Sequence, residues 1–265
     1  MSDDAMKNLQ NLHYTQDEAG VGVLAMARPP VNALGREMVA ELRATFDALA
    51  GDSSVRALVL TGEGRTFCAG ADLKERQTMS EDEVRAFVRS LSDTFQALAE
   101  LPVPTVAAIN GTAAGGGCEL VLACDFRVLD SAGRIGLPET TLAIVPGAGG
   151  TQRLPRLIGP SRAKRWIFSG RLYTAKEALA DGAVDLLAPA DKVRDAAVEF
   201  VTEMASSGPL AVRAAKSAVD AALSVPLLEG LEIEWRAYET ILDTEDRLEA
   251  LAAFKEKRSP VFKGR

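Results

Sequence analysis

Carboxylates are the side chains of this sequence best suited to acid–base chemistry. The chain has a single histidine, His13, in a segment that we expect to be a strand near the N-terminus. One histidine cannot build a His-rich metal site, and it argues against Ser/His and Cys/His nucleophilic arrangements. Neither a Walker loop nor a GxGxxG motif follows a predicted strand. Proton transfer therefore falls to Asp and Glu, and charge stabilisation falls to backbone dipoles.

Two glycine-rich segments could supply those dipoles. They are FCAGADLK, residues 67–74, and NGTAAGGGCEL, residues 110–120. Each follows a predicted strand, and open α/β sheets bind ligands beyond the carboxyl ends of their strands. If Gly116 begins a helix, its free N–H points outward from the positive end of the helix dipole. A tight turn that needs glycine is the alternative, and a lone GGG would favour it.

Glu119 and Glu139 are the candidate acid–base pair. Glu119 lies near the start of an apolar helical segment and close to Gly116. Glu139 follows Pro138 and precedes an apolar stretch, 142–145, and the run PGAGG at 146–150. Either glutamate alone could be an ordinary surface residue, which is the usual fate of Glu. Apolar and glycine-rich flanks around both acids favour a functional site instead.

Alternating strands and helices must position these residues. We predict strands at 21–26, 55–60, 103–109 and within 121–129, and helices at 36–50 and 81–101. Such alternation implies crossover connections and largely parallel pairing. The last third reads as helices at 191–206, 209–223, 226–242 and 246–255. We therefore predict an α/β core over residues 1–190, followed by a helical region over 191–265.

Composition excludes several classes of protein. The net charge of −7, from 30 basic and 37 acidic residues, argues against a dedicated nucleic-acid binder. Cys68, Cys118 and Cys124 form no CxxC pair or zinc spacing, which indicates a reducing compartment. The N-terminus lacks the pattern of a signal peptide, and no apolar run is long enough to span a bilayer. We expect a cytoplasmic protein with no membrane partner.

The motifs resemble the crotonase, or enoyl-CoA hydratase/isomerase, superfamily over nearly the whole chain, from about residue 21 to 265. The matching runs occur in order: FCAGADLKE, AAINGTAAGGGCEL, PETTLAIVPGAGGTQRLPRLIG and AFKEKRSP. The resemblance implies an α/β fold, a spiral of βαβ units followed by a C-terminal helical region that forms trimers or dimers of trimers. It also implies an acyl-CoA substrate, with coenzyme A as part of that substrate and no separate cofactor.

The resemblance also implies roles for individual residues. Ala71 and Gly116 would donate the two N–H groups of an oxyanion hole for the thioester carbonyl, and Glu119 and Glu139 would be the catalytic glutamates. The positions that match coenzyme A and substrate contacts are Ala69, Ala71, Asp72, Leu73, Lys74 and Gly116, with Phe254 and Lys257 often acting across a subunit boundary.

The presence of both glutamates favours hydration over the isomerase, dehalogenase, decarboxylase and thioesterase reactions of the superfamily. The motifs CAGADLKER and DRLEALAAFKEKR most resemble hydratases of 3-methylglutaconyl-CoA, which form 3-hydroxy-3-methylglutaryl-CoA in leucine degradation. Pro138 instead favours the alternative, a general short-chain enoyl-CoA hydratase of β-oxidation. Arg76, Arg85 and Arg89 could bind a distal substrate carboxylate or could form a solvated helix face.

Two readings from other classes compete with an enzyme. Some methylglutaconyl-CoA hydratases are reported to bind AU-rich RNA, but the acidity of this chain and the mixed charges of residues 75–89 argue against that role. A non-catalytic acyl-CoA binder is disfavoured because both glutamates are retained.

Overall fold

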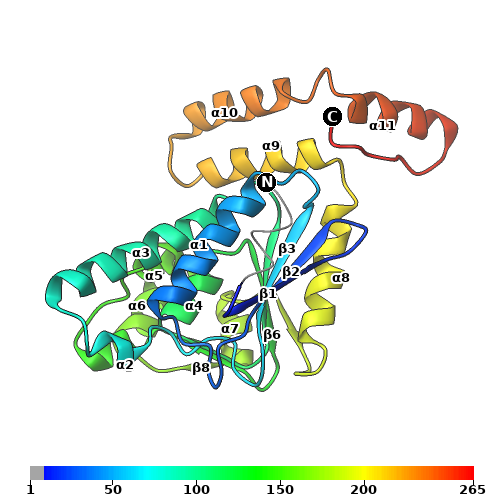
Figure 1. The fold of residues 1–265 in the computed structure, drawn as a ribbon. Coiled ribbons are helices and arrows are strands. Elements are labelled where there is room, and N and C mark those ends of the chain that lie inside the picture. The colour runs from blue at the N-terminus through cyan, green and yellow to red at the C-terminus, as the bar shows by residue number, and fades with distance from the viewer. Residues whose placement is uncertain (1–8) are drawn as a thin grey trace.

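Two β-sheets organise the chain. The computed structural model describes residues 9–265. The expectation that the N-terminus is not a signal peptide concerns a segment that lies largely outside the described residues. The larger sheet has the strand order β1-β2-β3-β4-β6-β9, and the smaller one has the order β5-β7-β8 (Figure 1). The strands of the larger sheet are β1 (Leu12–Gln16), β2 (Val21–Met26), β3 (Ala57–Gly62), β4 (Thr105–Ile109), β6 (Phe126–Asp130) and β9 (Leu186–Ala188). Those of the smaller sheet are β5 (Thr112–Ala114), β7 (Arg134–Gly136) and β8 (Tyr173–Thr174).

Strands β2, β3, β4, β6 and β9 run parallel, and only β1, the edge strand that carries His13, is antiparallel to its neighbour. In the smaller sheet, β5 and β7 are parallel, whereas β7 and β8 are antiparallel. The predicted α/β class and the largely parallel pairing are therefore confirmed. The smaller sheet escaped prediction because its strands have only two or three residues.

Helices cover both faces of the larger sheet. In chain order, the helices of residues 9–265 are α1 (Arg36–Ala50), α2 (Leu73–Arg76), α3 (Glu81–Ala99), α4 (Gly116–Val121), the 3₁₀ helix η1 (Glu139–Leu142), α5 (Gly150–Ile158), α6 (Pro160–Ser169), α7 (Ala175–Asp181), α8 (Val193–Ala205), α9 (Pro209–Ala221), α10 (Leu227–Glu239) and α11 (Glu245–Glu256). Strands β3 and β4 are buried along their whole length, which explains why they read as continuous apolar runs rather than alternating ones.

The start and the buried face of helix α3, which borders the site, are determined by local sequence signals. Ser80 and Glu83 form a reciprocal capping box at its N-terminus, which satisfies N–H groups that would otherwise lack acceptors. Phe87, Leu91 and Phe95 recur at helical spacing and are buried in the larger core cluster. The predicted helix at 81–101 is thus confirmed, with its end at Ala99.

The other face of the sheet has its own core. Val201 and other small apolar residues of α8 pack against Val59, Val106 and Val128 of the central strands. Helix α8 lies beyond the predicted division at residue 190, yet it covers the sheet, as Figure 1 shows. The division into 1–190 and 191–265 stays a prediction.

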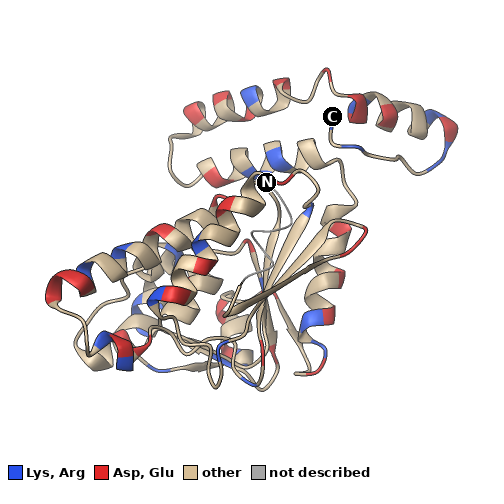
Figure 2. Cartoon of the chain, in the orientation of Figure 1, with Lys and Arg blue, Asp and Glu red and all other residues tan. Residues whose placement is uncertain are grey.

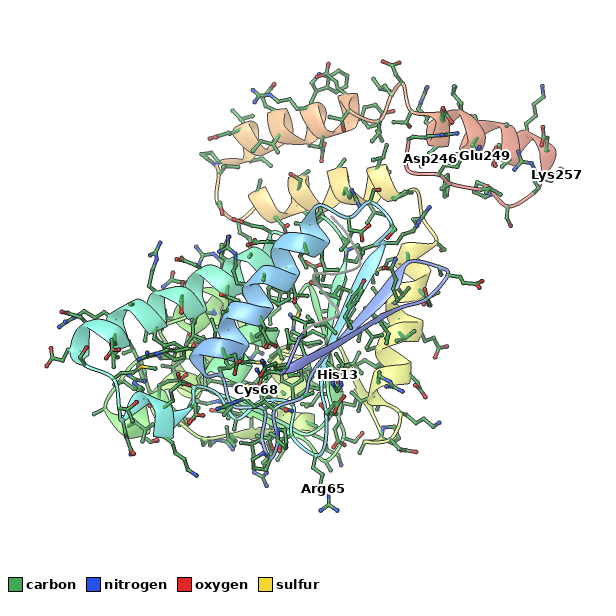
Figure 3. All side chains as sticks on the ribbon, viewed as in Figure 1. His13, Arg65, Cys68, Asp246, Glu249 and Lys257 are labelled. Carbon is green, nitrogen blue, oxygen red and sulfur yellow. The ribbon has the colours of Figure 1, made fainter. Side chains whose placement is uncertain are left out.

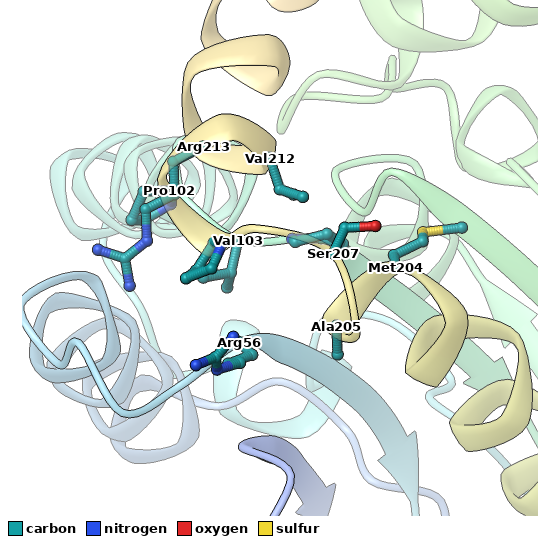
Figure 4. A pocket seen from close by; sticks show the side chains of 10 residues that line it. Arg56, Pro102, Val103, Met204, Ala205, Ser207, Val212 and Arg213 are labelled. Carbon is teal, nitrogen blue, oxygen red and sulfur yellow. The ribbon is translucent and has the colours of Figure 1, made fainter. Parts of the chain in front are cut away.

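Residues just before strands β4 and β6 bind the first of the C-terminal helices. Lys216 of α9 donates to the Asp125 carboxylate at 2.5 Å and to the Val103 carbonyl at 3.2 Å. A small pocket beside this junction is lined by Arg56, the segment before β4 and the α8–α9 connection (Figure 4). This pocket lies at the N-terminal ends of the strands, whereas the glycine-rich loops follow their C-terminal ends. The pocket is therefore separate from the candidate site.

Helices α9, α10 and α11 leave the α/β body. Helix α10 packs along α9, and α11 lies to one side of both (Figure 1). The C-terminal tail folds back on α11, where Asp246 accepts hydrogen bonds from the N–H groups of Lys263 and Gly264 at 2.6 and 2.8 Å. All four helices predicted after residue 190 are present. Within residues 9–265, no helix is both long and apolar enough to cross a membrane.

Candidate active site

The two glycine-rich loops leave neighbouring strands at the same edge of the sheet. Strands β3 and β4 pair in parallel, so the loops that follow them emerge side by side. Short backbone bridges fix the first loop in place: Leu34 pairs with Ala71 on one side, and Cys68 pairs with Ala113 on the other. The Ala71 region is therefore clamped between the segment before α1 and strand β5.

The N–H groups of Ala71 and Gly116 lie together. A Cβ added to Gly116 would stand 3.6 Å from the Ala71 nitrogen. The Leu34 bridge uses the Gly70 carbonyl and the Asp72 N–H, which leaves the Ala71 N–H unused, and Gly116 is the first residue of α4. Among residues 9–265, neither N–H donates to another group. Two neighbouring free donors form an arrangement that can bind a developing oxyanion.

Glycine is required beside both donors. Gly115 has φ 55° and ψ −124°, a conformation that L side chains rarely adopt. At Gly70, which has φ 93°, a Cβ would lie 2.8 Å from the Ala114 carbonyl oxygen. These glycines let the two loops approach each other closely enough to align the donors.

Glu119 is buried, with 3% of its surface exposed, and one of its oxygens is fixed. Its Oε1 accepts hydrogen bonds from the N–H groups of Ala148 and Gly150, both at 2.8 Å. Gly150 is the first residue of α5, so the carboxylate also lies at the positive end of that helix. Burial raises the pKa of Glu119, while the two N–H donors and the positive charge of Arg153 act to lower it.

Glu139 has a different environment. It begins η1 and is 9% exposed, and its Oε2 is buried without a hydrogen-bond partner among the described residues. Burial, with a smaller contribution from the charge of Glu119, raises the pKa of Glu139 to about 7. A Cβ at Gly115 would lie 3.3 Å from Glu139 Oε1, which places this carboxyl next to the donor of Gly116. The structure therefore places the Glu139 carboxyl beside the two free N–H groups, with Glu119 on the same helix as Gly116.

The loop expected to contact coenzyme A surrounds the first donor. Asp72 caps α2 by accepting from the N–H groups of Lys74 and Glu75, and it forms an ion pair of 2.7 Å with Arg28. These contacts, chiefly the one with Arg28, lower the pKa of Asp72. The carboxylate is thus engaged within the protein, whereas Ala69, Leu73 and Lys74 are exposed beside Ala71 and available to a ligand.

Phe254 and Lys257 are not near this site within one chain. Both lie at the end of α11, and Phe254 is 86% exposed. In Figure 3, Lys257 projects from the tip of α11, whereas Cys68, which marks the first loop, lies inside the α/β body. A role for these two residues at the site requires a neighbouring subunit.

Several other sequence expectations are resolved by the contacts. His13 is exposed and lies 2.6 Å from the Glu63 carboxylate, away from the two glutamates. Arg85 pairs with Glu81 and Asp82, and Arg89 pairs with Asp93, all on their own helix. They therefore form the solvated helix face that was the alternative to binding a substrate carboxylate. Over residues 9–265, no group of three or more His, Cys, Asp and Glu could hold a metal ion.

Sequence reasoning missed the residues that hold Glu119. The run PGAGG was noted only as a glycine-rich flank of Glu139, yet its Ala148 and Gly150 donate to Glu119 across 29 and 31 residues of sequence. A clue was present, since glycines followed by a helical pattern often mark a helix N-terminus, where free N–H groups accumulate.

Comparison with known proteins agrees with this geometry. The sequence profile described as enoyl-CoA hydratase/isomerase matches residues 16–265. The chain belongs to this family. The predicted superfamily and the predicted enzyme class, a hydratase-type lyase, are thereby confirmed.

Individual relatives match all or nearly all of this family member. It is 46% identical to a putative enoyl-CoA hydratase/isomerase of Bacillus subtilis, and the match covers 100% of both chains. It is also 46% identical to the human mitochondrial methylglutaconyl-CoA hydratase, over 95% of this chain and 76% of that protein. A crystal structure of an enoyl-CoA hydratase from Bacillus anthracis superposes with a TM-score of 0.94 at 46% identity, covering 97% of this chain and 100% of that one. The predicted crotonase-type fold is confirmed by this likeness.

Proposed function

We propose that the protein adds water across the α,β double bond of an enoyl-CoA thioester. The observation that carries this proposal is the contrast between two buried carboxyl groups beside two free N–H donors. Glu119 is held by N–H groups that stabilise its anion, whereas Glu139 has an unpartnered oxygen and a pKa raised to about 7. One group is suited to be a base and the other to be an acid at neutral pH.

In this proposal, Glu119 removes a proton from water while the water oxygen forms its bond to Cβ. The π electrons of the double bond move toward the thioester, and the N–H groups of Ala71 and Gly116 stabilise the oxygen of the resulting enolate. Glu139 then delivers its proton to Cα, and exchange through solvent passes the proton on Glu119 back to Glu139. Water is the only reactant besides the thioester, so the reaction needs no metal or separate cofactor.

The test is turnover. Purified protein should hydrate an enoyl-CoA, measured as loss of the ultraviolet absorbance of the conjugated thioester. Absence of hydration for both crotonyl-CoA and 3-methylglutaconyl-CoA would contradict the proposal.

For the substrate itself, we propose 3-methylglutaconyl-CoA, hydrated to 3-hydroxy-3-methylglutaryl-CoA. Support comes from the motif resemblance and from the human, mouse and rat methylglutaconyl-CoA hydratases, which are 45–46% identical to this chain. Relatives named only as enoyl-CoA hydratases are 44–46% identical, so the alternative of a general short-chain hydratase has comparable support. Arg76, half-buried at the end of α2, is the remaining candidate of the three arginines for a partner of the distal carboxylate.

We further propose that the protein assembles as a trimer or a dimer of trimers through its C-terminal helices. Support comes from large apolar side chains that are at least half exposed along α9, α10 and α11, including Leu228, Trp235, Tyr238, Leu251 and Phe254. Large exposed apolar patches on a protein often mark an interface with another chain. Assembly could also bring Phe254 and Lys257 to the site of a neighbouring subunit, where the resemblance assigns them coenzyme A contacts.

A reducing, cytoplasmic setting is also part of the proposal, supported by Cys68, Cys118 and Cys124, which are buried free thiols. Nucleic acid is not among the proposed partners. Figure 2 shows Lys and Arg interspersed with Asp and Glu on the helices, a mixed pattern unlike the basic stripe of a nucleic-acid binder.

A further inference from the structure

Arg153 of α5 joins three parts of the molecule that surround Glu119. Its Nη1 donates to the Ala148 carbonyl at 3.1 Å, and its Nη2 donates to Gln96 Oε1 of α3 at 2.7 Å. Ala148 is the same residue whose N–H donates to Glu119. One guanidinium therefore ties helix α3 to the short segment that fixes the carboxylate.

The backbone is shaped to admit this guanidinium. Gly149 has φ 113°, and a Cβ at that position would collide with the Arg153 head group. The glycine thus serves both the left-handed turn that begins α5 and the close approach of the arginine. The planar fork of Arg can bind two acceptors on different elements at fixed angles, which the single ammonium of Lys reproduces poorly.

The same side chain supplies positive charge. Arg153 is half-buried, and it acts on Glu119 through space without a direct ion pair. The other titratable groups that face this region are Glu139 of η1, the buried thiol of Cys118 on α4 and the buried thiol of Cys124, which acts on Arg153. From α3, Gln96 is neutral and bonds to Glu100, whose charge acts on Arg153. Arg153 is therefore the cationic group that bears on Glu119.

We propose that Arg153 is a positioning residue for hydration: it holds the Ala148–Gly150 segment so that Glu119 Oε1 stays fixed, and its charge favours the ionised form of Glu119. This inference rests on the proposed function for its kinetic consequences, but its effect on Glu119 exists whether or not the protein turns over a given substrate. Arg153 does not need to touch the substrate to act in this way.

The first test is kinetic. Arg153→Met should lower kcat by roughly tenfold to a hundredfold, as expected when a catalytic group is misplaced by about 1 Å, with KM little changed. The acid limb of the pH profile of kcat/KM should move to higher pH because the carboxylate loses its cation. Arg153→Lys keeps the charge and loses the fork, so kcat should fall while the acid limb stays in place. Arg156→Met is the matched control, because Arg156 lies on the same helix and, among the described residues, bonds only to Gln152 of that helix; it should change neither quantity.

A double-mutant cycle separates positioning from general structural damage. If Arg153 acts through Glu119, then adding Arg153→Met to Glu119→Gln should cause no further loss of residual activity. An equal loss in both backgrounds would overturn the proposal. Should Arg153→Met fail to fold, Gln96→Leu removes the contact of Arg153 with α3, along with the exposed Gln96–Glu100 hydrogen bond. It should give a smaller loss of kcat in the same direction, and an unchanged kcat there would count against the proposal.

A measurement independent of turnover keeps this inference distinct from the proposed function. Carbon-13 NMR of labelled glutamate carboxyls should show the Glu119 resonance, assigned by its loss in Glu119→Gln, titrating at higher pH in Arg153→Met than in the unmodified protein. No shift would refute the electrostatic part even if hydration is confirmed. A shift without hydration of any enoyl-CoA would refute the proposed function and leave the coupling of Arg153 to Glu119 standing.

Discussion

Glu119 accepts a hydrogen bond of 2.8 Å from the N–H of Gly150, the first residue of α5. The acid thus lies near the N-terminus of its own helix, α4, and against the N-terminus of another. The N–H groups at the start of α5 stabilise the anion of Glu119 and so act to lower its pKa, against the larger effect of burial, which raises it. Glu139, a few ångströms from the backbone of Gly115, lacks such donors on Oε2. This asymmetry underlies the predictions that follow.

The two glutamates should both be essential. We expect Glu119→Gln and Glu139→Gln each to lower kcat by about 10²–10⁴-fold, the usual contribution of a positioned acid or base, while coenzyme A binding is largely retained. Stopped-flow or steady-state hydration assays would measure the first effect and calorimetric titration the second. Glu37→Gln, at an exposed position of α1, is the control. Near-normal kcat in either active-site variant would remove that residue from the mechanism.

Glu139→Gln should also stabilise the protein at neutral and alkaline pH. Because folding raises the pKa of Glu139 from 4.5 to about 7, its contribution to stability is fully present below pH 4.5 and is lost as pH rises through 7. Glutamine does not titrate, so the variant avoids this loss. The gain should be absent below about pH 4.5 and reach at most roughly 3 kcal/mol above pH 7, reduced to the extent that water reaches the carboxyl. Urea unfolding at several pH values would measure it, and a gain independent of pH would show that Glu139 is not the titrating group.

The Gly116 N–H can be tested without changing a side-chain acid. Gly116→Pro should abolish most activity, because proline removes the donor while its fixed φ suits the first residue of a helix. Losing one such donor costs about 3 kcal/mol of transition-state stabilisation in other oxyanion holes. Gly116→Ala keeps the N–H, but its Cβ would lie 3.2 Å from Leu34 Cδ1, so a smaller loss is expected. A folded proline variant with the activity of the alanine variant would show that Gly116 is structural.

The elements bordering the site could be predicted because their sequence signals are local. Residues 21–26 and 36–50 match β2 and α1 to the residue. In each segment, the apolar residues follow the spacing of one type of element without interruption. Glu119 and Glu139 could be named from glycine-rich and apolar neighbours, and Gly116 from its expected place at the start of a helix, whereas Ala71 came from the resemblance.

What holds these residues together could not be predicted, because it is non-local. The donors to Glu119 come from residues about 30 positions away, and the clamp on Ala71 comes from Leu34, 37 positions earlier in the chain. Hydrophobic periodicity carries no information about such pairings. It also cannot tell a solvated arginine from a binding one; Arg85 and Arg89 were distinguished only by their ion pairs within α3.

The C-terminal helices should mediate assembly. We expect multi-angle light scattering at micromolar concentration to give the mass of a trimer or hexamer. Trp235→Glu places a charge on the exposed apolar face of α10 and should weaken the assembly, whereas Glu229→Lys, on another face of the same helix, should not. If Phe254 and Lys257 serve a neighbouring site, the weakened variant should also bind coenzyme A less tightly. A monomeric unmodified protein would refute the proposed assembly.

Substrate choice should depend on a partner for a second carboxylate. We expect 3-methylglutaconyl-CoA to be hydrated with a higher kcat/KM than crotonyl-CoA. A charge-assisted hydrogen bond in a partly dry pocket could contribute about 1.5–3 kcal/mol, or roughly tenfold to a hundredfold in discrimination. Arg76→Met should therefore impair methylglutaconyl-CoA by that factor and leave crotonyl-CoA nearly unchanged. Arg85→Met is the matched control, because Arg85 is exposed and already paired with Glu81 and Asp82.

Each outcome of that comparison identifies the preferred substrate or the residue that binds its distal carboxylate. Preference for methylglutaconyl-CoA that survives Arg76→Met would place the carboxylate partner on another residue. Preference for crotonyl-CoA in the unmodified protein would favour a general short-chain hydratase, consistent with Pro138 before Glu139. The proposed roles of Glu119, Glu139 and the two N–H donors would not change in that case, because they act on the thioester and its adjacent double bond, which both substrates share. Any preference must therefore arise from the groups that differ, which are the substituents on Cβ and the distal carboxylate, and the arginine variants test the contact with that carboxylate.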